Sequence, residues 1–277
     1  PVKYGQTLRA KVIKENSDYK FSTFINGDQW LSCILNPQQF DIVFSNNKDK
    51  CSLLLNLIIE ANKLNPGKFE KGEGLEVISE INFNIKCGLG SSSSLISNIA
   101  YLYDVDPYLL HTKVSSGSGY DVICARSESP ILYRLENLQP LVEKVNFYPV
   151  FHDQIAFVYT GQKMDSSISV NKFLTVDTDF KIEIVDVSGI SDELLNVNSL
   201  YSFNKLIFEH EKIMSSILKE KSVKENYFSD FYGEIKSLGA WGGDFLMVSS
   251  GNGLDYIRNY FEKKNMDIVI PFSKMIL

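Results

Sequence analysis

The chain has 277 residues, of which 44% are hydrophobic and 22% charged, and its net charge at neutral pH is −6. This composition is sufficient for packed cores and excludes a chain that is disordered throughout. The negative charge argues against nucleic acid or an anionic membrane as the main partner. An anionic small molecule stays compatible with it, because one pocket can be basic in an acidic protein. The length fits one large domain or two of ordinary size.

The four cysteines form no CxxC pair, and the three histidines form no HExxH or HxH pattern. We therefore predict neither a disulfide framework nor a metal site built on them. No secretory signal is visible, and no apolar run approaches the roughly 20 residues that span a bilayer. We expect a cytoplasmic protein with reduced thiols. The sequence begins at Pro1 without a methionine and enters strand-like sequence at once, so we expect that an N-terminal segment precedes it.

The first half of the sequence alternates between strand and helix patterns. Asn26-Gly27 is a turn signal between two strands, Asn65-Pro66-Gly67 ends a helical run, and Asp106-Pro107 starts another as N-cap and first helical residue. From hydrophobic periodicity we predict strands at residues 4–13, 19–25, 30–34, 75–85 and 131–135, helices at 50–64, 95–103 and 107–114, and a short segment at 122–125.

The pattern restarts after Pro149. We place a domain boundary there, so that the predicted domains are residues 1–150 and 151–277. The second half is richer in helix, with predicted strands at 154–159, 245–248 and 267–271 and predicted helices at 165–173, 191–197, 202–218, 224–238 and 253–264. No internal repeat is evident. The sequence therefore predicts an α+β chain in two lobes.

A glycine- and serine-rich stretch, Cys87–Ser94, lies between a predicted strand and a predicted helix. Such a turn leaves the first N–H groups of the helix unpaired, with the positive end of the helix dipole behind them. Gly88 and Gly90 let a ligand approach the backbone, and phosphate is the ligand that suits this arrangement. A purely structural turn with a serine N-cap is the alternative.

Two further glycine turns follow along the chain, Ser115–Asp121 (SSGSGYD) and Gly239–Asp244 (GAWGGD). The first turn is not a Walker loop, because no Gly-Lys-Ser/Thr follows at the required spacing, and a dinucleotide fingerprint would need glycine at Ser93. Three such turns, two of them rich in hydroxyl groups, favour a role in binding phosphate over a purely structural one.

In this order the three motifs resemble those of the GHMP kinases, a superfamily that includes galactokinase, homoserine kinase, mevalonate kinase and phosphomevalonate kinase. The resemblance spans most of the chain, and its specific matches are confined to the three motifs. It implies a two-lobed GHMP kinase fold, with an N-terminal mixed α/β lobe that holds the ATP phosphates and a C-terminal ferredoxin-like α+β lobe. The implied cofactors are ATP and Mg²⁺.

The resemblance also assigns roles to individual residues. A serine hydroxyl, that of Ser91 or Ser92, would help to ligate Mg²⁺, and Asp121 would act as base or electrostatic partner of the acceptor hydroxyl. The residues implied to bind the ATP phosphates are Gly88, Leu89, Gly90, Ser91, Ser92, Ser93 and Ser94. Those implied to contact the substrate are Ser118, Gly119, Tyr120, Gly239, Gly242, Gly243 and Asp244.

The sequence departs from the family pattern at several positions. Asn84 and Lys86 stand where a proline and often a glycine precede the first motif, and Trp241 stands where the third motif usually has glycine. The N-terminal Gly-Lys motif is absent. The glutamate that binds Mg²⁺ in mevalonate kinase has no clear match, because that region offers only His111 and Lys113. Either residues ahead of the first one complete the catalytic set, or the activity is reduced.

The acceptor decides which side chains the reaction needs. An alcohol such as mevalonate needs its proton removed, so Asp121 would act as a general base. A phosphate monoester is largely ionised at neutral pH and needs cations more than a base. Lys86, Lys113, Arg126 and Lys163 are the candidates, and Lys163, directly after a predicted strand, is the strongest. Transfer would be in line, without a covalent intermediate.

We therefore expect an ATP-dependent kinase of the mevalonate pathway that acts on a small molecule, as a monomer or a homodimer. Phosphomevalonate leads mevalonate as the expected acceptor, because a GAxGGD turn with a terminal aspartate looks most like that of phosphomevalonate kinases. The alternatives are a non-catalytic ATP- or metabolite-binding protein of the same fold, a sugar kinase, and an enzyme that resembles diphosphomevalonate decarboxylase.

Overall fold

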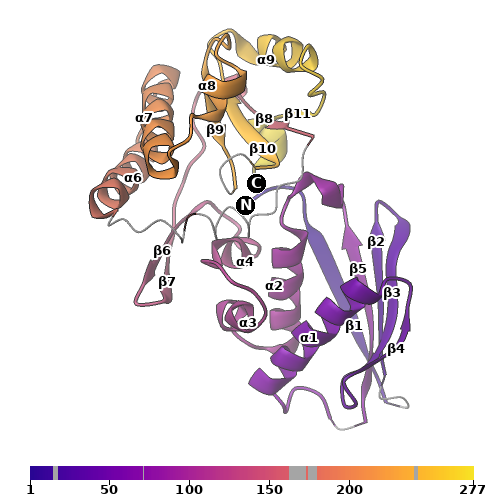
Figure 1. The fold of residues 1–277 in the computed structure, drawn as a ribbon. Coiled ribbons are helices and arrows are strands. Elements are labelled where there is room, and N and C mark those ends of the chain that lie inside the picture. The colour runs from indigo at the N-terminus through magenta and orange to yellow at the C-terminus, as the bar shows by residue number, and fades with distance from the viewer. Residues whose placement is uncertain (15–17, 71, 162–172, 174–179, 240–242) are drawn as a thin grey trace. The chain divides into compact units, whose positions relative to one another are not determined.

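The structure is a computed structural model that describes the chain except for residues 15–17, 71, 162–172, 174–179 and 240–242. The chain divides into two compact units, Pro1–Glu143 (unit 1) and Lys144–Leu277 (unit 2), which Figure 1 shows in a continuous colour ramp. The sequence placed the boundary near Pro149. None of the helices that the structure describes is long and apolar enough to cross a membrane.

Unit 1 contains a five-stranded mixed sheet. Only β2 and β5 pair in parallel, and the other neighbours are antiparallel. A register shift in the pairing of β3 with β4 leaves Val43 as an extra residue on the outermost strand, which is a β-bulge. The order across the sheet is β1 (Gln6–Ile13), β5 (Gly74–Ile81), β2 (Tyr19–Ile25), β3 (Asp28–Asn36) and β4 (Asp41–Ser45).

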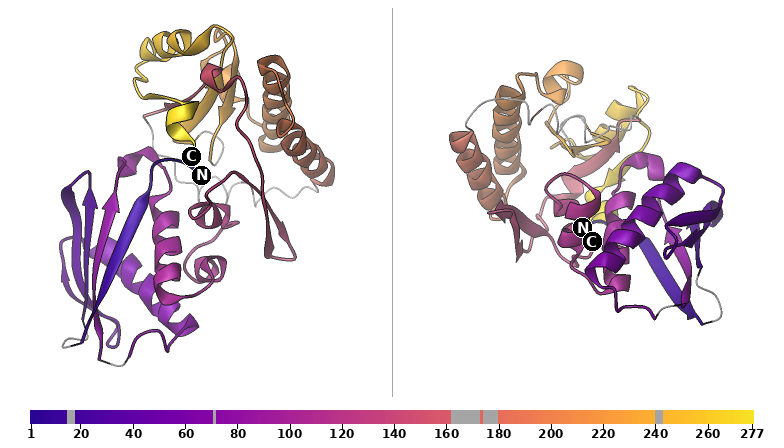
Figure 2. Two further views of the ribbon diagram at one scale, coloured as in Figure 1. Left: turned by 180° about the vertical axis from the view of Figure 1, so that it is seen from behind. Right: turned by 60° about the horizontal axis from the view of Figure 1, so that its bottom comes forward.

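The two long helices of unit 1 cover one face of this sheet (Figures 1 and 2). They are α1 (Lys48–Leu64) and α2 (Ser91–Tyr103), and they bury leucine, isoleucine and aromatic side chains against the strands. The side-chain amide of Asn65, at the end of α1, donates to the backbone oxygen of Tyr103 at 2.9 Å and so ties the ends of the two helices together. The burial of these apolar faces is the main source of stability in unit 1.

Two shorter α-helices, α3 (Pro107–Val114) and α4 (Tyr120–Cys124), and a 3₁₀ turn at Ile85–Cys87 complete the described helical part of unit 1. The carboxylate of Asp106 accepts from the N–H of Leu109 at 2.7 Å, which confirms the predicted N-cap of α3. A hairpin of β6 (Ile131–Glu136) and β7 (Gln139–Lys144) follows. Its two turn residues both have positive φ, as a type I′ turn requires. The sequence predicted the first of these strands and missed the second.

Unit 2 contains a four-stranded antiparallel sheet in the order β11-β8-β10-β9. Its core is a cluster of buried aromatic and aliphatic side chains that includes Phe228, Phe231 and Phe261. The strands are β8 (Ile155–Tyr159), β9 (Glu234–Ser237), β10 (Phe245–Ser249) and β11 (Val269–Pro271). The helices are α6 (Lys181–Leu194), α7 (Leu200–Leu218), α8 (Val223–Tyr227), α9 (Gly253–Glu262) and α10 (Phe272–Met275).

Two helix predictions in unit 2 need correction. The predicted helix at 224–238 is wrong, because α8 ends at Tyr227 and the chain returns as strand β9. Phe228, Phe231 and Ile235 are buried at helix-like spacing, but a turn and a strand bring them to the core. The predicted helix at 191–197 overlaps only the end of α6, which begins ten residues earlier. The predicted helix at 165–173 lies, apart from its last residue, outside the described residues.

Gly233, in the turn before β9, allows a test of the conclusion that residues 228–237 form a turn and a strand. Gly233 has φ 142°, and a Cβ there would lie 2.0 Å from the backbone oxygen of Ser249. We expect Gly233→Ala to lower the free energy of unfolding by about 3 kcal/mol, because backbone strain and overpacking add. Urea unfolding followed by circular dichroism measures the loss. Gly251→Ala is the control, because its nearest neighbour would be 3.9 Å away, and an equal loss in both variants would contradict the interpretation.

Candidate functional site

The first glycine turn of the sequence leads directly into α2. Gly88 and Gly90 both have positive φ, 63° and 80°, and Gly90 is the N-cap residue. The four serines Ser91–Ser94 therefore belong to the first turn of the helix rather than to the loop before it, and the alternative of a serine N-cap is wrong. Because glycine has no side chain to cap the helix, the first-turn N–H groups stay open to an anion.

The four serines differ in how far they are exposed. Ser92 is exposed, Ser91 and Ser94 are half-buried, and Ser93 is buried with 8% of its surface accessible. The first two hydroxyl groups are therefore available to a ligand at the helix end. Ser93 is turned toward the protein interior.

A hydrogen bond joins the first glycine motif to the second. The hydroxyl group of Ser93 donates to the Oδ2 atom of Asp121 at 2.5 Å, across 28 positions of sequence. The Oδ1 atom of Asp121 accepts from the backbone N–H of Val122 at 3.0 Å. Both oxygens of the carboxylate are thus oriented by the protein, and the carboxylate lies beside the first turn of α2.

Gly119 shapes the turn that carries Asp121. It is buried, it is the N-cap of α4, and its φ of 72° is left-handed. A Cβ at this position would lie 2.9 Å from the ring of Tyr108 and 3.1 Å from that of His111, both on α3. The turn therefore needs glycine for its backbone angle and for its close approach to α3.

Phenol groups surround this turn. The hydroxyl group of Tyr133, on β6, donates to the backbone oxygen of Ser118, and the rings of Tyr120 and Tyr133 pack edge to face with centroids 6.4 Å apart. Desolvation of the phenol group raises the pKa of Tyr120, although 51% of the residue's surface is accessible, and the negative charge of Asp121 raises it further. Desolvation, Tyr108 and Asp121 raise the pKa of Tyr133. Both phenols therefore stay protonated at neutral pH and can donate hydrogen bonds. No motif of the sequence marked Tyr133.

The cations predicted for the site lie in different environments. The guanidinium group of Arg126 stacks over the ring of Tyr101 at 4.1 Å, and Lys113 is exposed in the last turn of α3. Lys163 and the side chain of Lys86 lie outside the description. His111 is buried, and neither ring nitrogen has a hydrogen-bond partner among the described residues.

The third glycine turn belongs to unit 2. Gly239 has φ 73°. Gly243 is buried, and a Cβ there would lie 2.1 Å from the backbone oxygen of Leu238. The backbone oxygen of Asp244 accepts from the N–H of Thr160, at the end of β8, at 2.9 Å. Gly242 lies outside the described part of the chain. Close packing therefore explains Gly243, while Gly239 is explained by its backbone angle.

A charged network on α7 holds β9, the strand that leads into this turn. Lys236 Nζ donates to Glu211 Oε1 at 3.2 Å and lies 3.0 Å from Nδ1 of His210. The other oxygen of Glu211 accepts from the N–H and the hydroxyl group of Ser237. Burial favours the neutral carboxyl, but His210, Lys236 and Ser237 together hold the pKa of Glu211 below its usual range. No motif in the sequence predicted this network.

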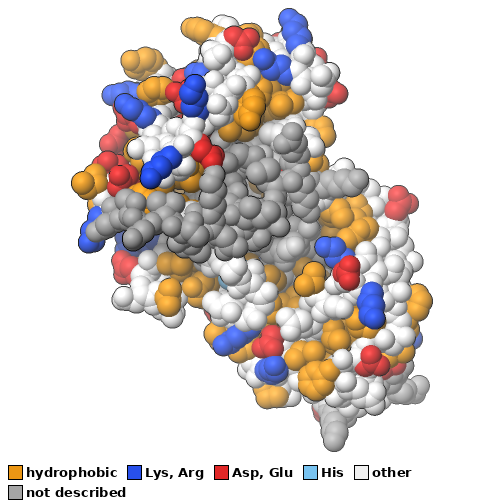
Figure 3. Space-filling model, in the orientation of Figure 1, with side chains coloured by type: hydrophobic (Ala, Val, Ile, Leu, Met, Phe, Trp, Pro, Cys, Tyr) orange, Lys and Arg blue, Asp and Glu red, His pale blue; other side chains and the backbone are white. Residues whose placement is uncertain are grey.

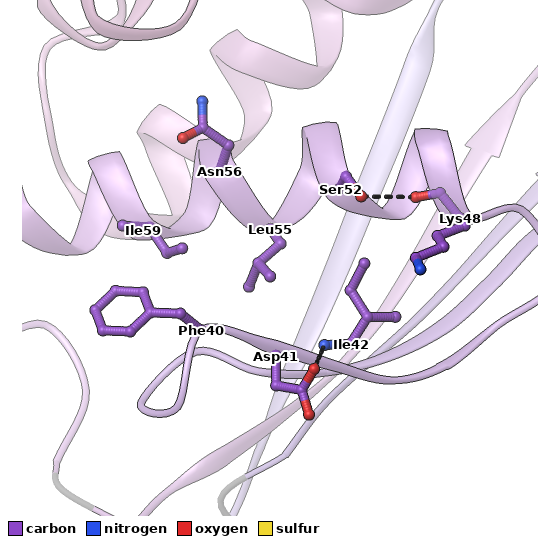
Figure 4. A pocket seen from close by; sticks show the side chains of 8 residues that line it. All are labelled: Phe40, Asp41, Ile42, Lys48, Ser52, Leu55, Asn56 and Ile59. Carbon is purple, nitrogen blue, oxygen red and sulfur yellow. Dashed lines mark hydrogen bonds between the residues drawn. The ribbon is translucent and has the colours of Figure 1, made fainter.

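A surface recess of about 350 Å³ lies elsewhere in unit 1, between β4 and α1 (Figure 4). Phe40, Leu55 and Ile59 face one another across it, and Ser52 donates to the backbone oxygen of Lys48 at its other end. Hydrophobic side chains also reach the surface around α1 and β4 (Figure 3). None of the predicted site residues lines this recess.

Comparison with solved structures shows that the chain has the GHMP kinase fold, which confirms the predicted fold class. Mevalonate kinase from L. major in complex with R-mevalonate is 16% identical, with a TM-score of 0.63, and the match covers 97% of this chain and 86% of that one. Phosphomevalonate kinase from Streptococcus pneumoniae, in complex with phosphomevalonate and AMPPNP, is 17% identical, with a TM-score of 0.63 and coverage of 92% and 87%.

Galactokinase from Lactococcus lactis, complexed with galactose, is 12% identical, with a TM-score of 0.59 and coverage of 98% and 86%. No family model matches the sequence. No curated protein sequence matches it either. At these identities the likeness establishes the fold.

The backbone angle and close contacts of Gly119 predict that replacing it with alanine destabilises the protein. We expect Gly119→Ala to lower the free energy of unfolding by about 2 to 3 kcal/mol, since a left-handed φ and two ring contacts both oppose a Cβ. Gly117→Ala is the matched control, because Gly117 also has positive φ but no atom of the described residues would lie within 4 Å of its Cβ. Urea unfolding of both variants measures the difference. Equal losses would show that the contacts with α3 do not matter.

The Glu211 network predicts a pH dependence. The folded-state pKa of Glu211 is lowered, so its contribution is present above the unfolded pKa and is lost as pH falls through the folded pKa. We expect Glu211→Gln to cost about 3 kcal/mol of stability at pH 7 and progressively less as the pH falls below about 4.5, the ordinary pKa of a glutamate. Glu209→Gln removes an exposed carboxylate of α7 as control. A pH-independent difference from the unaltered protein would contradict the expectation.

Proposed function

We propose that the chain is an ATP-dependent kinase that transfers a phosphoryl group to a small molecule. The observation that carries this proposal is the hydrogen bond from Ser93 to Asp121, because it places a carboxylate beside a helix N-terminus open to an anion. Phosphoryl transfer needs those two parts together, donors that hold the phosphates and a group that orients the acceptor. The GHMP kinase fold supports the same reaction.

The triphosphate of ATP would bind at the start of α2. Gly88 and Gly90 let the phosphates approach the backbone, and the first-turn N–H groups and the helix dipole would stabilise their charge. Among the described residues, no atom would lie within 4 Å of a Cβ at Gly90, so the space beside it is open. Such a turn suits an anion larger than a carboxylate.

Mg²⁺ would accompany ATP. The ion usually takes only one or two ligands from the protein and the others from phosphates and water. This fits a turn that offers the hydroxyl groups of Ser91 and Ser92, where no three His, Cys, Asp or Glu side chains gather among the residues described. When bound, the ion would neutralise charge on the phosphate oxygens.

Asp121 would orient the acceptor and receive its proton. Each of its oxygens accepts one hydrogen bond inside the protein and keeps lone pairs for a further donor. Asp121 itself is exposed, so a hydroxyl group of a substrate can reach it. Tyr120 is also exposed and would contact the same substrate.

Two acceptors of the mevalonate pathway lead this proposal. The terminal aspartate of the Gly239–Asp244 turn favours phosphomevalonate. The carboxylate of Asp121 favours mevalonate, because a hydroxyl acceptor needs a base. A phosphate dianion would instead be repelled by the negative charge of the carboxylate. We propose Lys163 as the cation that a phosphate acceptor would need. Gly239, Gly243 and Asp244 are proposed to contact the substrate.

A non-catalytic nucleotide-binding protein of the same fold is the second candidate. The observation that favours it is His111, which lies where the Mg²⁺-binding glutamate of mevalonate kinase is expected and is buried without a hydrogen-bond partner among the described residues. ADP release with mevalonate, phosphomevalonate, diphosphomevalonate, galactose and homoserine separates the two candidates. ATP binding without turnover of any acceptor would support the second.

Asp121→Asn tests the proposed base. The substitution keeps the shape of the side chain and removes its charge, so we expect kcat with a hydroxyl acceptor to fall by about 10² to 10⁴, while KM for ATP changes by less than about twofold. Asp49→Asn is the control, because Asp49 also lies in the first turn of a helix. Unchanged turnover of a hydroxyl acceptor would show that Asp121 is not the base.

A further inference from the structure

We infer that Ser93 is a positioning residue, which holds the carboxylate of Asp121 at a fixed place relative to the nucleotide-binding end of α2. This inference rests on the proposed function. It assigns Ser93 a role different from that of the serines beside it. Ser91 and Ser92 would serve the nucleotide, while Ser93 serves the aspartate that faces the acceptor.

The geometry of the Ser93 hydroxyl group supports this role. Ser93 is 8% exposed, whereas Ser92 is exposed, so the two hydroxyl groups point to different surroundings. The Ser93 hydroxyl group donates to Oδ2 of Asp121, and a hydrogen bond from a hydroxyl group to a carboxylate is stronger than one between two neutral groups. Its single proton is committed to the carboxylate and is not available to a phosphate oxygen.

The short helix that carries Asp121 does not by itself fix the position of the carboxylate. Helix α4 has only five residues, and its N-cap, Gly119, has no side chain to fix the first turn. Asp121 is exposed, so packing does not hold its side chain in one rotamer. The bond from Val122 N–H orients Oδ1 locally, and the bond from Ser93 connects Oδ2 to another element.

Helix α2 is longer and more deeply buried than α4. It has 13 residues, and Ile99, Ala100 and Tyr103 are almost completely buried in the core of unit 1. Because Ser93 belongs to this packed helix, its hydrogen bond holds the exposed carboxylate of Asp121 at a fixed position relative to α2. The N–H groups that would hold the phosphates and the hydroxyl group that fixes Asp121 then belong to the same helical turn, so the distance between donor and acceptor sites is set by one rigid element.

The test is a double-mutant cycle in the full chain, with Ser93→Ala, Asp121→Asn and the double variant assayed for ADP release with the acceptor that the unaltered protein turns over. We expect Ser93→Ala to lower kcat roughly 10- to 100-fold, as misplacement of a reacting group does, with KM for ATP changed less than about twofold. In the Asp121→Asn background the same substitution should have no further effect, because Ser93 acts only through the carboxylate. Ser93→Thr keeps the hydroxyl group and should restore most of kcat.

Ser97→Ala is the matched control. Ser97 lies one turn further along α2, is 1% exposed, and its hydroxyl group has no partner among the described residues. We expect its kcat to match that of the unaltered protein. If Ser97→Ala slows turnover as much as Ser93→Ala, or if Ser93→Ala lowers kcat equally in both backgrounds, the role of Ser93 is only structural and the inference is wrong.

The failure of this inference is distinct from the failure of the proposed function. Absence of turnover by the unaltered protein with every acceptor overturns the kinase proposal and the role of Ser93 with it. Turnover by the unaltered protein together with an additive cycle overturns the role of Ser93 alone. Turnover with a non-additive cycle supports both.

Discussion

The candidate site depends on one backbone conformation, the left-handed φ and ψ of Gly90, the N-cap residue of α2. Gly90, with φ 80°, turns the chain so abruptly that all four serines fall within the first helical turn. No neighbouring atom crowds this glycine, so its backbone angle alone explains the residue. One consequence is that no side chain caps the N–H groups of the first helical turn. The other is that the third serine of the run faces inward and meets Asp121.

Local patterns predicted most of the fold. Caps and breakers placed α1 and α3 to within two residues, because Asn65 and Asp106 act on the backbone close to them, and the Asn26-Gly27 signal placed the turn between β2 and β3. The predictions were wrong where contacts between residues far apart in the sequence determine the secondary structure. Phe228, Phe231 and Ile235 have the spacing of a helix, yet Gly233 packs against the backbone of β10 and turns the segment into a strand. Strand β7, largely exposed, carried no alternating pattern.

The candidate site was predictable to the extent that its chemistry lies in local motifs. Glycines beside serines, and an aspartate after Gly119, are visible in the sequence, and the structure brings Ser93 and Asp121 of these two motifs together. The bond itself was not predictable, because its partners are 28 residues apart and the family resemblance grouped Ser93 with the phosphate-binding residues. Tyr133 and Glu211 were missed because they lie in an ordinary strand and an ordinary helix, where only tertiary contacts give them a role.

The bulge at Val43 has a consequence for the behaviour of the protein in solution. Strand β4 is one of the two edge strands of the described unit 1 sheet, and Val43 and Phe44 on it are 56% and 50% exposed. A regular edge of this kind would be a template for pairing with another chain. The extra residue breaks the ladder spacing, so a second strand cannot continue the hydrogen bonds along the edge. The irregularity thus protects a hydrophobic edge from edge-to-edge aggregation.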